Sequence, residues 1–267
     1  MLVLRLSVHN KLKLCFVADD YSESKETNRA IEDVCTGNVV RSISIVASES
    51  SVYSDFLFKP DKDITLGIHL YLSDYIPLTT QMKTFSKKGK TINKSNIVFG
   101  LMTGKIPLRH IYEEFDAQIV RLRELGHQPR FIDTHQNIHS FPLIFRVVRQ
   151  IAAKYGMENN IRPFAQLDFC RKRTWRSFVS WAYAVAVNFR RRSRVLVGCP
   201  GYREKAINIS QVLNDWDRFL FEVTQKGYDE IFVPCHPGIS PAEVDLYSSP
   251  DFLELIRKHQ IYLAKGD

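Results

Sequence analysis

Two kinds of hydrophobic pattern alternate along the chain. Short apolar segments have the length of strands and lie at residues 13–18, 42–47, 65–70, 130–133, 161–162, 230–234 and 260–264. Longer segments repeat apolar residues every three or four positions and predict helices over residues 26–36, 110–125, 142–155, 211–226 and 250–258. A glycine directly follows each of the first four helices, and a proline begins the third and the fifth, which is typical of helix ends.

The regular alternation of strand and helix predicts parallel strands joined by crossover helices. The 267 residues, of which 45% are hydrophobic, are enough to form one large core. We therefore expect an α/β fold with a single domain over residues 1–267. The connection at about residues 74–108 is long and rich in Lys, Thr and Gly, which is more typical of an insertion that forms a lid or binding loop than of a plain linker.

Cysteine usage and the length of the apolar runs bear on the compartment. The five cysteines form no C-x-x-C pair and their number is odd, which favours reduced thiols over a disulfide framework. Cys15 and Cys235 lie inside apolar runs, so we expect them in the core. The first nine residues lack the apolar region of a signal peptide, and no apolar run approaches the roughly 18 residues of a membrane span. A cytoplasmic location is therefore expected.

The positive charge is concentrated in one segment. The chain has 37 basic and 29 acidic residues, a net charge of +8. Residues 171–194 contain eight basic residues and no acidic one: Arg171, Lys172, Arg173, Arg176, Arg190, Arg191, Arg192 and Arg194. The rest of the chain is formally neutral. The wider segment 169–194, here called the basic aromatic segment, also contains six aromatic residues: Phe169, Trp175, Phe178, Trp181, Tyr183 and Phe189.

The basic aromatic segment has three interpretations. A helix with basic flanks and a Trp-bearing apolar face suits peripheral attachment to the anionic inner face of a membrane. The same pattern serves equally for a barrel helix with one buried face and solvated ends. Nucleic-acid binding is not expected, because no nucleic-acid fold motif is present. Salt-sensitive co-sedimentation with anionic vesicles would support the first interpretation, and its absence would leave the second.

Polar residues capable of catalysis follow most of the predicted strands. They are Asp19 and Asp20, then His69, then Asp133 with His135 and His139, then Arg162, and finally His236. In a parallel barrel these strand ends share one face, where the active site lies. Taken alone, an Asp-Asp pair is more often a turn with a helix cap, and a single histidine is more often structural. Their joint occurrence at strand ends is hard to explain by packing.

These residue types suggest metal chemistry. Two histidines and one aspartate form a three-ligand set that leaves positions open for water and substrate. The spacing of His135 and His139 is not interpreted as helical, because Ser140 and Pro142 indicate that the helix begins after them. One carboxylate of a pair can hold a metal while the other acts as a base.

Two further residues have open roles. Asp133 either binds the metal or orients a ligand histidine. Arg162 has two interpretations, contact with an anionic or hydroxyl-rich substrate and a plain surface position.

Four ordered motifs between residues 13 and 240 resemble the YdjC-like carbohydrate deacetylases, which include the chito-oligosaccharide deacetylases. The motifs are Val-Ala-Asp-Asp-Tyr at 17–21, Leu-Gly-Ile-His-Leu at 66–70, Ile-Asp-Thr-His-Gln-Asn-Ile-His-Ser-Phe-Pro at 132–142 and Cys-His-Pro-Gly at 235–238. The resemblance implies a distorted TIM-like (β/α) barrel. It also implies a carbohydrate N-deacetylase, a hydrolase that removes the N-acetyl group from an N-acetylated amino sugar.

The resemblance further implies the role of each residue. Asp20, His69 and His135 would hold one divalent metal ion, Asp19 would be the base and His236 the acid. The family is usually described with Mg²⁺, whereas two imidazole ligands suit Zn²⁺ better. We assign substrate binding to His139, Arg162 and Asp133. The chain departs from the family pattern at Tyr21-Ser22, where Phe-Gly is usual, and at Asn137, where a histidine is frequent.

Two alternatives to deacetylation remain at this point. The same ligands could serve a metal-dependent hydrolase with another substrate, such as a phosphoester. A non-catalytic protein could instead use the basic aromatic segment to bind a membrane or nucleic acid. Within the leading hypothesis, a phosphate-bearing or lipid-linked sugar would match the charge of that segment.

Overall fold

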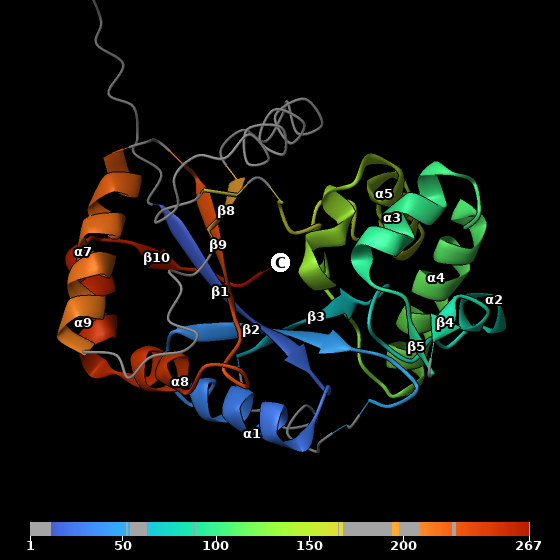
Figure 1. Cartoon of the computed structure of the whole chain (residues 1–267). Coiled ribbons are helices and arrows are strands. Elements are labelled where there is room, and N and C mark those ends of the chain that lie inside the picture. The colour runs from blue at the N-terminus through green and yellow to red at the C-terminus, as the bar shows by residue number, and fades with distance from the viewer. Residues whose placement is uncertain are drawn as a thin grey trace, which may run out of the picture.

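The computed structural model of the chain describes residues 12–51, 53, 63–87, 89–164, 166–167, 194–197, 209–225 and 228–266. A curled sheet of parallel strands lies at the centre, and helices cover its outer side (Figure 1). The basic aromatic segment, together with Cys170 and Cys199, lies outside the described residues, apart from the backbone of Arg194. None of the described helices is both long and apolar enough to cross a membrane.

The central sheet follows the order β6-β3-β2-β1-β9-β8-β7, with β10 paired to the start of β1. Every ladder in this sheet is parallel. The strands are β1 Lys13–Tyr21, β2 Val40–Val46, β3 Thr65–Leu70, β6 Ile132–Thr134, β7 Gln166–Leu167, β8 Arg194–Val197, β9 Glu230–Cys235 and β10 Tyr262–Leu263. The predicted parallel α/β architecture is therefore confirmed.

The curvature of the sheet fits a distorted TIM-like barrel, although a closed ring is not seen. The strands β6 and β7 stand at the two ends of the hydrogen-bonded path, and no ladder joins them within the described residues. A single parallel bridge between Ile132 and Ile161 extends the β6 end. The described part of the chain thus forms a half-barrel.

The five predicted helices are present. They are α1 Lys25–Val34, α4 Leu108–Glu124, α5 Pro142–Tyr155, α7 Ile209–Gln225 and α9 Pro250–Lys258. Gly126 and Gly156 have the positive φ expected after a helix, 86° and 73°. The predicted end of the first helix at residue 36 is wrong, because Cys35 caps α1 and Gly37 does not adopt the left-handed conformation.

The structure also contains elements that the sequence pattern did not indicate. The connection 74–108 folds into α2 Thr80–Lys83, a hairpin of β4 Ser86–Lys87 and β5 Lys90–Thr91, and α3 Lys94–Met102. A further helix, α8 Pro241–Ser248, follows β9. Helix α3 lacks a clear apolar face, since its apolar residues are nearly continuous. Gly100 lets it approach Ile106, whose side chain would lie 2.6 Å from an added Cβ.

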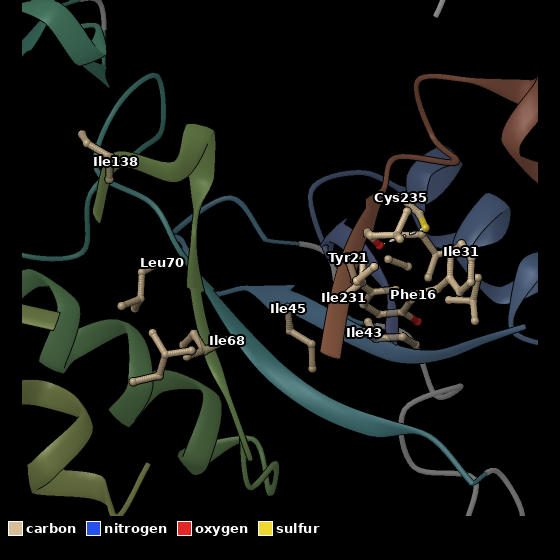
Figure 2. Packing of buried hydrophobic residues seen from close by; sticks show 14 of the residues in the cluster. Phe16, Tyr21, Ile31, Ile43, Ile45, Ile68, Leu70, Ile138, Ile231 and Cys235 are labelled. Carbon is tan, nitrogen blue, oxygen red and sulfur yellow. Dashed lines mark hydrogen bonds between the residues drawn. The ribbon is translucent and has the colours of Figure 1, made fainter. Parts of the chain in front are cut away.

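Successive residues of β1 alternate between two hydrophobic cores. Leu14 and Phe16 point towards the helices, whereas Cys15 and Val17 point into the half-barrel and contact its interior cluster. The ring of Phe16 packs against aromatic residues of three helices: Trp216, Phe252 and Tyr247, at centroid distances of 5.9, 5.8 and 5.1 Å. Figure 2 shows Phe16 beside Ile31 and Tyr21 in this outer core. The predicted burial of Cys15 and Cys235 is confirmed.

Gly67 on β3 is required by the ring of Phe131, which fills the interior of the half-barrel. A Cβ at residue 67 would overlap that ring, and Phe131 is itself buried. We predict that Gly67→Ala lowers the free energy of unfolding by about 1–3 kcal/mol, the usual cost of overpacking a core. Urea denaturation would measure the change. Gly37→Ala is the matched control, because its Cβ would come no closer than 3.4 Å to another atom. Equal stability of the two variants would contradict the prediction.

Candidate active site

A β-bulge brings Asp19 and Asp20 to the same side of β1. Ala18 pairs with Ile43 and Tyr21 with Ile45, so the two aspartates lie opposite the single residue Ser44. Asp20 has a positive φ of 69°. In a regular strand the two carboxylates would point to opposite faces. Because the bulge adds one residue, Asp20 points to the same face as Asp19, and Tyr21 is the next residue that points outward. Both carboxylates are buried, and both approach His69.

Three side chains from separate strand ends converge beside the bulge. The carboxylate Oδ1 of Asp20 lies 3.3 Å from Nε2 of His69 and 3.5 Å from Nδ1 of His135. The candidate ligand atoms of these three residues all lie within 4.8 Å of one another, which is a suitable separation for one shared ion. The side chain of His135 is 23% exposed, so the cluster is open to solvent on this side.

The hydrogen bonds of His69 leave one ring nitrogen for a ligand. Its Nδ1 donates to Oδ1 of Asp133, which also accepts a hydrogen bond of 2.6 Å from the hydroxyl of Ser44. With Nδ1 engaged by Asp133, Nε2 is the ring nitrogen that faces Asp20 and can bind an ion once it has lost its proton. Burial alone lowers the pKa of His69, but the charges of Asp133 and Asp19 raise it to about 9. The pocket therefore favours positive charge at this position.

Arg162 is not a surface residue. It is 3% exposed, and its Nη1 lies 2.6 Å from Oδ1 of Asp19 and 2.7 Å from Oδ2 of Asp133. Burial raises the pKa of Asp19, and the positive charge of Arg162 acts in the opposite direction. Burial also raises the pKa of Asp133, but the charges of Arg162 and His69 outweigh it and lower the value to about 2. Arg162 therefore bridges the carboxylates of Asp19 and Asp133.

A second group of potential ligands overlaps the first. Asp19, His69 and Asp133 also offer atoms within 4.8 Å of one another, and all three are buried. However, the guanidinium of Arg162 already contacts both carboxylates of this group. In addition, Nδ1 of His69 is bonded to Asp133. The first group, in which Nε2 of His69 faces Asp20 and one side is exposed, is the better candidate for an ion.

His236 faces the other oxygen of Asp19. Its Nε2 lies 3.7 Å from Oδ2 of Asp19, and its side chain is 22% exposed. The backbone N–H of His236 donates a 2.6 Å hydrogen bond to the carboxylate of Glu243 on α8. Gly238, in the same loop, packs so closely on Thr27 that an added Cβ would lie 2.7 Å from its hydroxyl. These contacts fix the loop that carries His236 between α8 and α1.

His139 is separated from the solvent and from the candidate ligands. Its Nε2 lies 3.1 Å from the carbonyl oxygen of Arg162, and its Nδ1 contacts the hydroxyl of Thr134. Because a carbonyl can only accept, Nε2 carries the proton and Nδ1 accepts from Thr134. Residues 135–140 form a 3₁₀ turn rather than part of α5, which agrees with a helix that begins after His139. His139 therefore buttresses the segment that carries Arg162.

Three residues of the site were missed in the sequence. Ser44 is on the inward side of β2, and its alternation with Ile43 and Ile45 was an available signal. Tyr71 donates a 2.6 Å hydrogen bond to Oδ1 of Asp20, and Glu243 holds the loop of His236. No local pattern marked these two, since their contacts are with residues distant in the sequence or on another element.

Comparison with known proteins gives a family for this arrangement. A family model described as YdjC-like protein matches residues 13–259. The chain is 29% identical over 153 residues to a carbohydrate deacetylase of Geobacillus stearothermophilus and 26% identical over 170 residues to one of Danio rerio. These alignments cover 57% and 60% of this chain, and they span only 60% and 53% of the two relatives.

Two further comparisons cover most of the chain. A carbohydrate deacetylase of Clostridium beijerinckii is 25% identical over 250 residues, which is 91% of this chain and 90% of the relative. A crystal structure from Enterococcus faecalis, described as a cellobiose-phosphate cleavage protein, superposes with a TM-score of 0.70 over 96% of this chain and 98% of that one. At 21% identity, this likeness supports the fold alone.

The buried position of His139 generates a pH prediction. Burial and the nearby charge of Arg162 lower the pKa of His139 to about 4, whereas the pKa of a histidine in an unfolded chain is near 6.5. The unfolded chain thus binds more protons between these values, so stability falls as the pH decreases from about 6.5 to 4. The contribution is about 3 kcal/mol, because one pKa unit corresponds to about 1.4 kcal/mol. Urea unfolding at several pH values would give the free energy of unfolding as a function of pH. Between pH 4 and 6.5 this free energy should depend less on pH in His139→Gln than in the wild type, and an equal dependence would contradict the assignment.

Proposed function

The chain belongs to the YdjC-like protein family, and on that premise we propose that it is a metal-dependent carbohydrate deacetylase. It would remove the N-acetyl group from an N-acetylated amino sugar. The observation that carries the proposal is the convergence of Asp20, His69 and His135 next to the pair formed by Asp19 and His236. The three relatives named carbohydrate deacetylases supply the substrate class.

The donor set fits one divalent ion held by Asp20, His69 and His135. The ligands are one carboxylate and two imidazoles, and the hydrogen bond of Nδ1 to Asp133 leaves Nε2 as the nitrogen of His69 that would bind the ion after losing its proton. Three carboxylates, those of Asp19, Asp20 and Asp133, are buried in the site. Among the described residues of the site, Arg162 is the one permanently charged cation, and it contacts Asp19 and Asp133. A divalent ion would balance the remaining negative charge. Two imidazoles suit Zn²⁺ or a similar transition metal, and Mg²⁺ is the alternative.

The residues of the chain would divide the reaction between them. When bound, the ion would acidify a water molecule and polarise the acetyl carbonyl. Asp19 would accept the proton of the attacking water, a role that fits its pKa, which burial raises above the usual value. His236, 3.7 Å from Asp19 and partly exposed, would give a proton to the departing amine. Water attack and amine protonation would release acetate and the free amino sugar.

Three residues assigned to substrate binding would act by positioning in this proposal. Arg162 would hold Asp19 in place through the 2.6 Å hydrogen bond. Asp133 would orient His69, and His139 would support the backbone at Arg162. Because Asp133 and His139 have no exposed surface, a sugar would reach neither of them directly.

The defining experiment measures acetate release and substrate mass together. The purified protein would be loaded with Zn²⁺ or Mg²⁺ and incubated with N-acetylated amino sugars of one to several units. Loss of one acetyl group from the sugar, matched by free acetate, is expected. A panel of phosphoesters tests the alternative hydrolase, and turnover of phosphoesters without any deacetylation would overturn the proposal.

The more specific hypothesis about the substrate is based on the sequence alone. A phosphate-bearing or lipid-linked sugar, and attachment to an anionic membrane, would suit the charge of the basic aromatic segment, which lies outside the described residues. Including phosphorylated and lipid-linked N-acetyl sugars in the substrate panel would test the first part of this hypothesis. Vesicle co-sedimentation at low and high salt would test the second.

We predict that loss of any proposed ligand lowers metal content and activity together. His69→Ala and His135→Ala each remove one of three donors, so metal analysis after dialysis should show a large loss of bound ion. His259→Ala is the control, because this histidine contacts Asp217 outside the site. Full occupancy in either ligand variant would show that the ion is held elsewhere.

In the same assay, variants of the proposed base and acid should lose activity without losing the metal, unlike variants of the proposed ligands. Asp19→Asn keeps the shape of the side chain but cannot accept the proton, so it should retain the metal and lose ~10²–10⁴ in rate. His236→Ala should also retain the metal and slow the departure of the amine. Asp215→Asn, on the exposed side of α7, serves as the control. Loss of the metal in Asp19→Asn, or a normal rate in either variant, would refute this division of roles.

A further inference from the structure

Tyr71 contacts all three proposed metal ligands, and its contact with His69 is an edge-to-face approach of the two rings at 5.4 Å. Its hydroxyl donates a 2.6 Å hydrogen bond to Oδ1 of Asp20. Its ring stacks on the imidazole of His135, with centroids 4.1 Å apart and planes inclined by 18°. The residue is buried, so these contacts are shielded from water. In the sequence, Tyr71 lies two residues after His69, and this position alone does not indicate a role in the site.

We propose that Tyr71 is a positioning residue that holds Asp20 and His135 in the geometry of the metal site. The hydroxyl fixes the direction of the carboxylate, and the ring fixes the plane of the imidazole. This inference rests on the proposed function, since it presupposes that these residues bind an ion. It goes further, because it assigns part of the affinity of the site to a residue outside the proposed ligand set.

The backbone explains why these two ligands need such support. Asp20 stands in a bulge with a φ of 69°, outside the regular ladder of β1. His135 opens a 3₁₀ turn, and the next two residues, Gln136 and Asn137, both have positive φ. His69, in contrast, lies within β3 and is fixed by Asp133. Two of the three ligands therefore come from irregular backbone, and Tyr71 connects them.

Helix α4 in turn fixes Tyr71. The side chain of Gln118 accepts a 3.0 Å hydrogen bond from the backbone N–H of Tyr71 and donates one of 2.8 Å to its carbonyl. This amide thus satisfies the backbone of Tyr71 just beyond the end of β3, where the strand ladder stops. Because Gln118 is buried and its amide is hydrogen-bonded, it holds Tyr71 in a fixed position relative to α4.

Glu114, one turn before Gln118, extends the same clamp. Its carboxylate accepts from the amide of Gln118 at 3.1 Å and from the backbone N–H groups of Leu78 and Thr79 at 3.0 and 2.9 Å. Helix α4 therefore holds the chain at both ends of the segment 71–79, which leads into α2 (Figure 1). Tyr71 is placed by a rigid helix rather than by a free loop.

The test is the affinity for the metal, measured by calorimetric titration of metal-free protein with Zn²⁺. Tyr71→Phe keeps the stack and removes the hydroxyl, so the dissociation constant should rise about tenfold. Tyr71→Leu removes both contacts, and the rise should approach about 100-fold, the upper range for residues that orient ligands. Gln118→Ala, which contacts neither ligand, should weaken binding in the same direction. Thermal unfolding of the metal-free proteins verifies that each variant is folded. If the other two variants do not fold, the nearly isosteric Tyr71→Phe is sufficient for the test.

Tyr155→Phe is the matched control. It also removes a hydroxyl that donates a hydrogen bond to a carboxylate, here 2.7 Å to Asp116, but outside the site. Its dissociation constant should equal that of the wild type. If the wild type binds metal and Tyr71→Phe binds it equally well, the inference is overturned while the proposed function stands. If the wild type binds neither Zn²⁺ nor Mg²⁺, the metal site itself is wrong and the inference fails with it.

Discussion

The bulge in β1 is the constraint on which the rest of the site depends. A regular strand would send Asp19 and Asp20 to opposite faces, one into the half-barrel and one into the helical core. The additional residue opposite Ser44 turns both carboxylates inward. Bulges are rare between parallel strands, and a positive φ at a residue other than glycine costs of order 1–3 kcal/mol. The surrounding structure can sustain this cost because β1 is paired along both edges and anchored by Phe16 in an aromatic cluster.

The bulge has an electrostatic consequence, since it concentrates negative charge in a buried space. Asp19, Asp20 and Asp133 are all nearly inaccessible to solvent. Arg162 compensates for part of this charge through contacts with Asp19 and Asp133, and it leaves Asp20 to the two histidines. Asp19 and Asp20 have identical side chains, but their different surroundings give them different proposed tasks. One aspartate is held by a guanidinium beside His236, and the other faces the imidazoles where a cation would be most stable.

The support of the site comes largely from helices rather than from the strands that carry the ligands. Helix α4 clamps Tyr71 through Gln118, and α8 holds the loop of His236 through Glu243. Each of these buried polar side chains satisfies backbone groups that the sheet leaves without a ladder partner. The connection 74–108 is tied to the same helix through Glu114.

The particular residues show what could be read from the sequence and what could not. Alternating apolar runs and amphipathic stretches were sufficient to predict a parallel α/β sheet, because periods of two and of 3.6 residues reflect local backbone geometry. The placement of Asp19, Asp20, His69, Asp133, His135 and His236 at strand ends followed from the same pattern, since the carboxyl ends of parallel strands meet at one edge. These inferences needed no knowledge of which strands are neighbours.

Only the tertiary structure decided how these residues divide their contacts. The direction of Asp20 depends on how β1 pairs with β2, and a register shift leaves no mark in the sequence of one strand. Arg162 could be a surface residue or a substrate contact until the fold brought it to Asp19, 143 positions away in the sequence. The orientation of His69 was set by Asp133, and the tautomer of His139 by Thr134 and a carbonyl oxygen. The position of Tyr71 was set by an amide on α4. Long-range hydrogen bonds of this kind depend on distances in the folded chain, whereas sequence patterns record only the faces that a regular element presents.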